Sequence, residues 1–314
     1  MTLLQKFMAV SVFGLNALLG RETAAGLRQG HAPGSIVAIG GNEDKTSDMT
    51  VLKALTTEAK GIGSRIVVVT TASTEPDKRQ QEYSRAFTAL GVEDFTFIYI
   101  DNRDQAFDPH VYKKLSGADI IFFSGGDQLR LTALLAGTPF LSAVRQLHKD
   151  GAVVGGTSAG GAVLSDLMVY GGQSGQAAKK GEVLLTGGFR FVDRVAFDTH
   201  FLNRERLPRL LNIVASNPEI LGIGMDEDTG VIFHDGGDTF EVVGSGKVTV
   251  VDGIRIQSNF HTIERGEAAH YRNAVVYTLS AGDRFNIKAK TPIRATRHVV
   301  HGAVRVLNQP DRIP

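Results

Sequence analysis

The chain has 314 residues, of which 42% are hydrophobic and 21% are charged, and its formal net charge is +1. This composition is that of a folded globular protein, which excludes a collagen, a coiled coil and wholesale disorder, and the near-zero charge gives no reason to expect nucleic acid or an anionic membrane as partner. The absence of cysteine excludes disulfides, thiolate metal sites and a cysteine nucleophile.

Residues 1–34 are expected to form an N-terminal extension. A mostly apolar run over 7–20 follows Lys6 and loosely resembles a signal peptide, but Asn16 interrupts it and Arg21-Glu22 stand where a cleavage site prefers small neutral residues. We therefore expect a cytoplasmic protein, with secretion as the alternative if residues 1–25 act as a signal peptide. No later run reaches the roughly 18 consecutive apolar residues of a membrane-spanning helix.

From residue 35 the sequence alternates short apolar runs with amphipathic stretches, which predicts a doubly wound α/β fold with a mostly parallel sheet flanked by helices. The expected strands are 36–39, 65–69, 95–99, 119–123 and 151–154, and the expected helices lie near 48–60, 77–90, 109–116 and 127–149. The crossovers should be right-handed.

After about residue 180 the pattern changes to short strands with glycine-rich turns, as in 230–234, 239–243 and 247–251. We predict that these strands extend the same sheet in antiparallel fashion. Since no repeat or low-complexity linker is visible, a single domain is expected over 35–293, followed by a C-terminal tail over 294–314.

The sequence Gly156-Thr157-Ser158-Ala159-Gly160 follows the strand expected over 151–154 and precedes a helical stretch through residue 167. A serine on such a strand-to-helix turn is held in a strained, exposed position, and the helix N-terminus directs N–H groups at developing negative charge. This context favours Ser158 as a catalytic nucleophile and the N–H of Ala159 as an oxyanion donor. The alternative is a phosphate-binding or simply tight glycine turn.

A second glycine-rich segment, Gly125-Gly126-Asp127-Gln128, follows the strand expected over 119–123 and precedes a helix. It is either an ordinary loop with a helix cap or part of the site. Because neighbouring parallel strands would bring it beside the serine, we favour Gly126 as a second oxyanion donor and Gln128 as a substrate-binding amide.

A serine nucleophile needs a base. His200 ends the strand-like run 194–200, and sites assemble at the carboxyl ends of strands in α/β sheets, so His200 is the favoured base. The remaining downstream histidines are weaker candidates: His234, His261, His270, His298 and His301.

Three carboxylates, Asp226, Glu227 and Asp228, end another short apolar run. Such a cluster suits an acid that orients an imidazole, a cation site or a solvated turn. In the company of a serine and a histidine, Glu227 is the favoured acid. The chain order Ser, His, acid differs from the Ser, acid, His order of α/β-hydrolases, which indicates an independent origin for the turn.

Arg204, Arg206 and Arg209 follow the candidate base, and Pro208 must lie in the first turn of the next helix, where its missing N–H costs nothing. Arg204 and Arg206 therefore stand at the helix entrance, close to His200. Arginines bind planar carboxylates through paired hydrogen bonds, so the segment is either a carboxylate-binding surface or a solvated helix start.

Four motifs in this order resemble cyanophycinase, a serine peptidase family that also contains aspartyl dipeptidase: 125–128, 156–160, 198–209 and 222–229. The resemblance covers roughly residues 35–293, and Ala281-Gly-Asp-Arg-Phe285 also resembles that family's closing strands. It implies a fold like that of class I glutamine amidotransferases and a single catalytic domain over 35–293.

The resemblance also implies an activity: exopeptidase hydrolysis of cyanophycin, multi-L-arginyl-poly-L-aspartate, to β-Asp-Arg dipeptides through an acyl-enzyme, with no metal and no organic cofactor. By motif match, Ser158 is the nucleophile, His200 the general base and Glu227 the acid that orients it. A homodimer is likewise implied. The residues expected to line the substrate groove are Gln128, Asp198, Thr199, Arg204, Arg206 and Arg209.

The sequence departs from the family pattern at two places. Thr199 stands where glutamine is common, and Asp228 and Gly230 stand where asparagine and alanine are common, so the substrate preference is open to change while the triad is kept. Two other functions are weighed: an aspartyl dipeptidase or other β-aspartyl peptidase of the same superfamily, and a catalytically silent binding protein related to glutamine amidotransferase-like domains. The length after residue 230 argues against the first, and the intact Ser, His and Glu set against the second.

Overall fold

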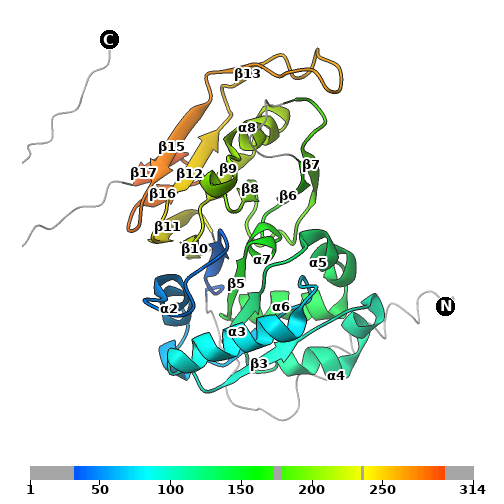
Figure 1. Cartoon of the computed structure of the whole chain (residues 1–314), viewed down its shortest axis with the longest axis vertical. Helices are drawn as coiled ribbons and strands as arrows, with labels where there is room; N and C mark the ends of the chain where they lie inside the picture. Colours follow the sequence, from blue (N-terminus) through cyan, green and yellow to red (C-terminus); the bar gives the residue numbers. More distant parts are fainter. Residues whose placement is uncertain (1–31, 173–178, 235–236, 294–314) are drawn as a thin grey trace, which may run out of the picture.

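The computed structural model describes residues 32–172, 179–234 and 237–293 (Figure 1). Most of the N-terminal extension expected over 1–34, with the possible signal segment over 1–25, and all of the tail expected over 294–314 lie outside the described residues. Among the described residues, no helix has both the length and the apolar character that crossing a bilayer requires.

The centre of the fold is a parallel sheet of five strands, of which the four inner ones are buried and the edge strand is half-buried over three of its four residues. Its order is β1 (Ile36–Ile39), β5 (Val153–Thr157), β4 (Ile120–Phe123), β2 (Ile66–Val69) and β3 (Phe95–Ile98), and every neighbouring pair in this set is parallel. The α/β fold predicted from the alternating pattern is therefore confirmed.

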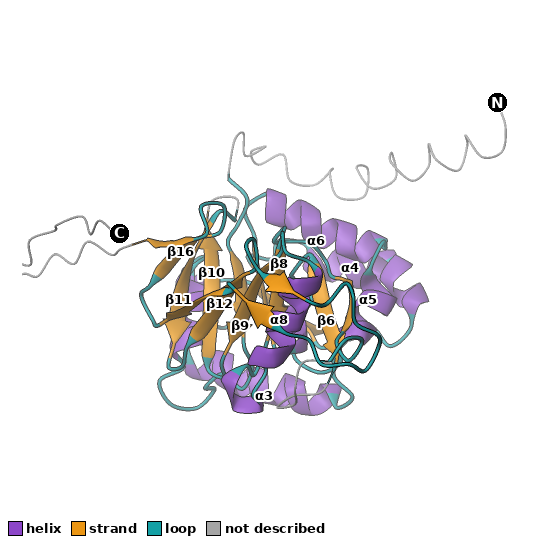
Figure 2. Ribbon diagram, turned by 90° about the horizontal axis from the view of Figure 1, so that it is seen from above, coloured by secondary structure: helices purple, strands orange, loops and turns teal. Residues whose placement is uncertain are grey.

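Helices cover both faces of this sheet (Figure 2). Alternate side chains of β1 enter two different apolar clusters: Val37 and Ile39 pack with α2 (Thr50–Thr57) and α3 (Pro76–Ala89), and Ile36 and Ala38 lie in the cluster that contains the helices of the other face. Those helices are α4 (Pro109–Tyr112), α5 (Gln128–Leu135) and α6 (Pro139–Lys149). Short 3-10 helices lie between these elements: η1 (Gly61–Gly63), η2 (Arg103–Phe107) and η3 (Lys113–Leu115).

Antiparallel strands complete the sheet beyond β1. They follow in the order β10 (Thr229–His234), β11 (Thr239–Gly244), β16 (Arg284–Asn286) and β17 (Thr291–Ile293). A second sheet has the order β15 (Val275–Leu279), β12 (Val248–Asp252), β9 (Leu221–Met225) and β8 (Val195–Asp198), with β8 and β9 parallel. The prediction that 247–251 extends the main sheet was therefore wrong, whereas 230–234 and 239–243 do extend it.

The remaining elements lie around the second sheet. Helix α8 (Leu207–Ser216) packs on it beside β9, and β6 (Leu167–Gly171) pairs with β7 (Leu184–Gly187). A small hairpin is formed by β13 (Gln257–Ser258) and β14 (Tyr271–Arg272). Pro208 lies in the first turn of α8, as predicted.

Three expected helices differ from the structure. The helix expected near 109–116 is the short helix α4 followed by the 3-10 helix η3. The helix expected over 127–149 is divided into α5 and α6, because Gly137 adopts a φ of 72° and Thr138 caps the new helix that begins at Pro139. The helical stretch expected through residue 167 is the short helix α7 (Ala159–Ala162), and Leu167 already begins β6.

The turn from β5 to α7 is tightly packed against the neighbouring strand. Ser158 has φ 53° and ψ −115°, a backbone conformation that is costly for a residue with a side chain. A Cβ atom added at Gly160 would lie 2.0 Å from the carbonyl oxygen of Phe123 at the end of β4. Glycine at this position is therefore what allows the turn to lie against β4.

This packing makes a stability prediction. Gly160→Ala should lower the free energy of unfolding by about 1–3 kcal/mol, because backbone atoms must move to admit the methyl group. Chemical denaturation monitored by circular dichroism measures this change. The control is Gly63→Ala, where a Cβ would meet nothing within 4 Å. Equal stabilities for the two variants would contradict this account of the turn.

Candidate active site

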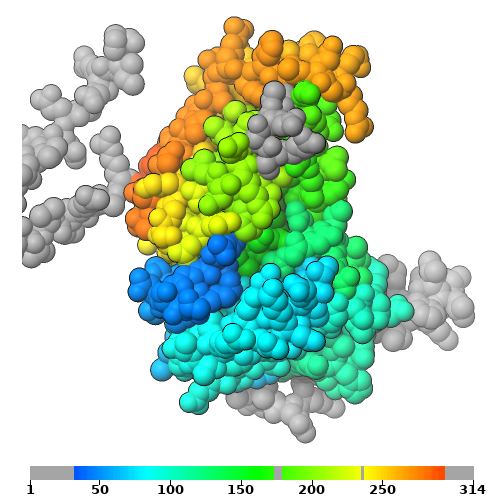
Figure 3. Space-filling view, viewed as in Figure 1, coloured from blue at the N-terminus to red at the C-terminus, as the bar shows by residue number. Residues whose placement is uncertain are grey.

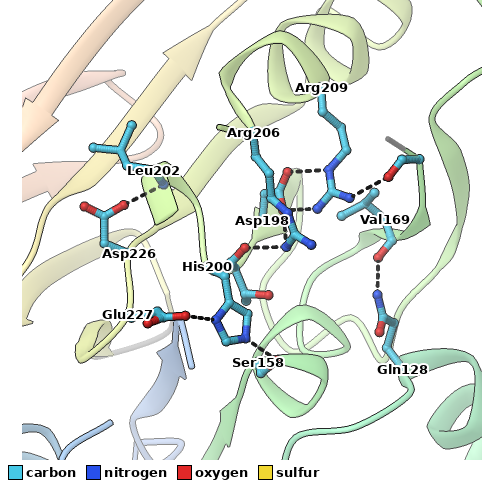
Figure 4. A network of polar contacts seen from close by, with 12 residues as sticks. Gln128, Ser158, Val169, Asp198, His200, Leu202, Arg206, Arg209, Asp226 and Glu227 are labelled. Atoms are coloured by element: carbon cyan, nitrogen blue, oxygen red, sulfur yellow. Dashed lines mark hydrogen bonds and ion pairs between the residues drawn. The ribbon is translucent and has the colours of Figure 1, made fainter. Parts of the chain in front are cut away.

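The structure brings three of the predicted site residues into one hydrogen-bonded chain (Figure 4). The distance from Ser158 Oγ to His200 Nε2 is 2.9 Å, and that from His200 Nδ1 to Glu227 Oε1 is 2.7 Å. Ser158 follows β5, His200 follows β8 and Glu227 follows β9. Three strands that are far apart in the sequence thus end at one place, which is the arrangement that a serine, its base and an orienting acid require.

Backbone contacts fix the position of the histidine. The N–H of His200 donates to the carbonyl oxygen of Gly40 at 2.8 Å, and the residue itself has a φ of 50°. Gly41 has a φ of 107°, and a Cβ added there would lie 2.4 Å from Cε1 of the imidazole. The loop after β1 is therefore the surface against which the imidazole packs, and only glycine leaves room for it.

Only one of the three clustered carboxylates contacts the imidazole. Besides His200, Glu227 accepts a hydrogen bond from Asn42 Nδ2 at 3.1 Å. Asp226 accepts hydrogen bonds from the N–H groups of Leu202 and Lys247. Asp228 also binds loops, accepting from the N–H of Asp44 and the hydroxyl of Ser245. The three carboxylates therefore have different partners. Glu227 contacts the histidine, whereas Asp226 and Asp228 hold the neighbouring loops in place.

The surroundings lower the pKa values of both His200 and Glu227. Burial of the ring lowers the pKa of His200, and the positive charge of Arg204 lowers it further, although the hydrogen bond to Glu227 opposes the shift. The hydrogen bond from His200 lowers the pKa of the Glu227 carboxyl. At neutral pH the imidazole is therefore neutral and the carboxylate ionised, so that Nε2 can accept a proton from the serine hydroxyl.

A hollow of about 220 Å³, which we call the arginine hollow, lies on one side of Ser158. Its walls come from the ends of β4, β5, β6 and β8 and from the segment that enters α8. All the residues expected to bind substrate line it: Gln128, Asp198, Thr199, Arg204, Arg206 and Arg209.

Inside this hollow Asp198 contacts both Arg206 and Arg209. Asp198 is fully buried, and Arg209 donates to both of its carboxylate oxygens, from Nε at 2.8 Å and from Nη2. Arg206 contacts Asp198 and donates to the carbonyl oxygen of Thr199. Burial lowers the pKa of Arg206 to about 10, so it stays charged at neutral pH. With Arg204 included, three cations face one anion, and the hollow has an excess of positive charge.

The other predicted residues are also placed at this edge of the sheet. Gln128 begins α5, and its Nε2 donates to the carbonyl oxygen of Val169 at 2.8 Å, so the amide is held in one orientation. Gly126 and Ala159 line the hollow beside Ser158. Thr199 is buried and directly precedes His200.

The loop that follows β1 also belongs to the site and was not predicted from the sequence. Asn42 contacts Glu227, and Glu43 is buried directly beneath the turn that carries Ser158, where it accepts a hydrogen bond from Thr157 Oγ1 at 2.5 Å. The signal was available, because Gly40-Gly41-Asn42-Glu43 follows a buried strand just as Gly125-Gly126 does, and parallel strands end at the same edge. Among the described residues, no group of three histidine or acidic side chains is arranged to hold a metal ion.

Comparison with known proteins gives relatives over most of the chain. The cyanophycinase of Geminocystis herdmanii is 36% identical over 261 residues, which are 82% of this chain and 96% of the relative. That of Thermosynechococcus vestitus is 38% identical, over 81% of this chain and 80% of the relative. That of Trichormus variabilis is 34% identical, over 84% and 89% respectively.

The fold also has a counterpart among solved structures. The crystal structure of a peptidase from an acI-B1 Actinobacterium superposes with a TM-score of 0.62 and 23% identity, covering 82% of this chain and 98% of that one. Residues 36–241 match the family described as peptidase family S51. Because of this family match and the sequence identities to the cyanophycinases, the chain belongs to peptidase family S51, the serine peptidase family of the cyanophycinases.

Proposed function

We propose that this peptidase hydrolyses cyanophycin to β-Asp-Arg dipeptides, acting as an exopeptidase through a Ser158–His200–Glu227 triad. The observation that carries the proposal is the unbroken hydrogen-bonded chain from Ser158 Oγ to the Glu227 carboxylate, which opens into a hollow lined by three arginines and one aspartate. The relatives at 34–38% identity are cyanophycinases, which supports the choice of substrate.

The chemistry follows from the geometry. As Ser158 Oγ attacks the carbonyl carbon of a backbone peptide bond, His200 Nε2 takes its proton, and Glu227 stabilises the imidazolium through Nδ1. The imidazolium then gives that proton to the departing amine, which leaves an ester between Ser158 and the acyl part. Water, deprotonated by the same imidazole, resolves the ester and frees the enzyme.

Two backbone N–H groups are proposed to stabilise the oxyanion. Ala159 begins the short helix after the nucleophile, and Gly126 lies at the end of the neighbouring strand β4. Each donor of this kind, when it is fixed before the reaction, contributes about 3–4 kcal/mol to the stability of the transition state.

The charges of the arginine hollow suit a zwitterionic polymer. Each unit of cyanophycin carries a guanidinium and a carboxylate, and guanidinium groups bind carboxylates in paired, planar fashion. Because Asp198 already accepts from Arg209 and Arg206, we assign Arg204 to direct contact with a substrate carboxylate and Asp198 to holding its neighbours. The homodimer and the cytoplasmic location expected from the sequence stay predictions.

Removal of the nucleophile gives the first test. Ser158→Ala should lower turnover of cyanophycin by about 10⁴- to 10⁶-fold, because the ester can no longer form, while binding of the polymer is retained. Release of β-Asp-Arg, followed by mass spectrometry, measures the loss. Ser142→Ala, at an exposed serine of α6, is the matched control and should behave as wild type. Wild-type turnover in Ser158→Ala would exclude this mechanism.

The lowered pKa of His200 sets the pH dependence. Activity needs the neutral imidazole, so kcat/KM should be constant near neutral pH and decline on acidification as His200 gains a proton. Because burial lowers this pKa, the midpoint of the acid limb should lie below 6.5, the ordinary value for histidine. A pH profile of kcat/KM on a soluble peptide of β-Asp-Arg units measures it. A midpoint at or above 6.5 would show that the imidazole is not in the environment described.

The contact between the first loop and the imidazole gives a third prediction. Gly41→Ala should slow both cyanophycin hydrolysis and labelling of Ser158 by a fluorophosphonate by about 10- to 100-fold, because the new methyl group displaces the ring of His200. Gly187→Ala is the control, since a Cβ there meets nothing within 4 Å. Labelling of Gly41→Ala at the wild-type rate would mean that this loop does not position the base.

A further inference from the structure

A second hollow, of about 530 Å³, lies on the other side of the nucleophile. It shares Gly126, Ser158, His200 and Arg204 with the arginine hollow, so both open onto the same serine. Its own walls are the loop after β1 and the first half of α3, and Figure 3 shows these segments, in blue and cyan, side by side on one face. We call it the loop-side hollow and define it by Asn42, Glu43, Lys45, Arg79 and Tyr83.

The floor of the loop-side hollow is a fixed polar network around a buried acid. Glu43 accepts from Tyr83 Oη and from Thr157 Oγ1, each at 2.5 Å, and pairs with Lys45 Nζ at 2.8 Å. Burial opposes ionisation of Glu43, but the charge of Lys45 and these hydrogen bonds together hold its pKa below the ordinary value. The carboxylate of Glu43 therefore has hydrogen-bond and ionic partners within the protein. It holds Lys45, Tyr83 and Thr157 in place around the hollow.

The cations of this hollow keep donors for a ligand. Lys45 Nζ contacts the side chain and the backbone oxygen of Glu43 and lies 5.2 Å from the centroid of the Tyr83 ring. Among the described residues, only two of its three N–H groups therefore have an oxygen acceptor. Arg79 is paired with Glu82 on its own helix at 2.6 Å, through one nitrogen, and its side chain is 38% exposed. Its guanidinium has further N–H groups that can point into the hollow.

We propose that the loop-side hollow binds the β-Asp-Arg unit on the opposite side of the scissile bond from the unit held in the arginine hollow, and that Arg79 and Lys45 bind a carboxylate of that unit. This inference rests on the proposed function and extends it. A peptide bond attacked by Ser158 has a substrate residue on each side, and hollows on both sides of the serine accommodate them together.

The chemistry of the unit fits these residues. In cyanophycin the arginine is joined through its α-amino group, so each unit keeps a free α-carboxylate. Glu43 is neutralised by Lys45 and Glu227 is engaged with His200, so the acids that line the hollow already have partners. The hollow is lined by three cations, Lys45, Arg79 and Arg204, against two carboxylates, Glu43 and Glu227, and this excess of positive charge favours a carboxylate over a guanidinium.

The test uses Arg79→Gln and a soluble peptide of two β-Asp-Arg units joined by one peptide bond. Arg79 is chosen because its partner Glu82 lies on the same helix and the side chain is exposed, so the fold does not depend on it. KM should rise about tenfold, as expected for a lost charge-assisted hydrogen bond, with kcat within about twofold of wild type. Labelling of Ser158 by a fluorophosphonate should be unchanged. Arg85→Gln, at an exposed arginine on α3 that does not line this hollow, should match wild type throughout.

Two modified peptides make the assignment specific. In each, the arginine α-carboxylate of one unit is converted to an amide. For one of these peptides, the KM of wild type should rise by the same factor of about ten. With this peptide, Arg79→Gln should cause no further rise, because the two changes remove the same contact. For the other peptide, the effect of Arg79→Gln should persist. An unchanged KM for Arg79→Gln, or an effect that both amidated peptides retain, would overturn the inference while the proposed function stands. Failure of wild type to cleave the two-unit peptide, with Ser158 still labelled, would instead overturn the proposed substrate and this inference with it.

Discussion

The site depends on the close approach of backbone segments at the carboxyl edge of the parallel sheet. The imidazole of His200 lies against Gly41, and the turn that carries Ser158 lies against the end of β4 at Gly160, with no room for a side chain at either glycine. The strained backbone of Ser158 is tolerated because β5 is buried between β1 and β4, whose hydrogen bonds fix its register. The strands thus fix the positions of the residues that we propose as the reacting groups, which lie on the loops that follow them.

Charge is distributed unevenly around this centre. The acids close to Ser158 each have partners within the protein. Glu227 bonds His200, and Asp198 accepts from Arg209 and Arg206. Glu43 pairs with Lys45 and accepts from two hydroxyl groups. The cations outnumber these acids, so the field at the serine favours anionic ligands and an anionic transition state. Burial of the ring, together with the positive charges of Arg204 and Arg206, lowers the pKa of His200, so that its imidazole remains neutral at neutral pH.

Much of the fold and of the central site could be predicted from the sequence, because the signals are local. Buried apolar runs alternating with helices gave the parallel sheet, and the glycine-flanked serine lies on the turn where it was expected. What could not be predicted depends on contacts distant in sequence. The pattern of β12 marks it as a strand but does not say that β9 and β15 are its neighbours. Likewise the pairing of Asp198 with Arg209 and the burial of Glu43 under Thr157 exist only once the chain has folded.

The central claim is that a substrate peptide bond lies over Ser158 with one unit on each side. A crystal structure of the Ser158→Ala protein with the two-unit peptide tests this most directly. We expect the scissile carbonyl carbon about 3–3.5 Å from the place of the serine oxygen, its oxygen toward the N–H groups of Gly126 and Ala159, and one unit in each hollow. A peptide bound with both units in one hollow, or with its peptide bond away from residue 158, would contradict the account.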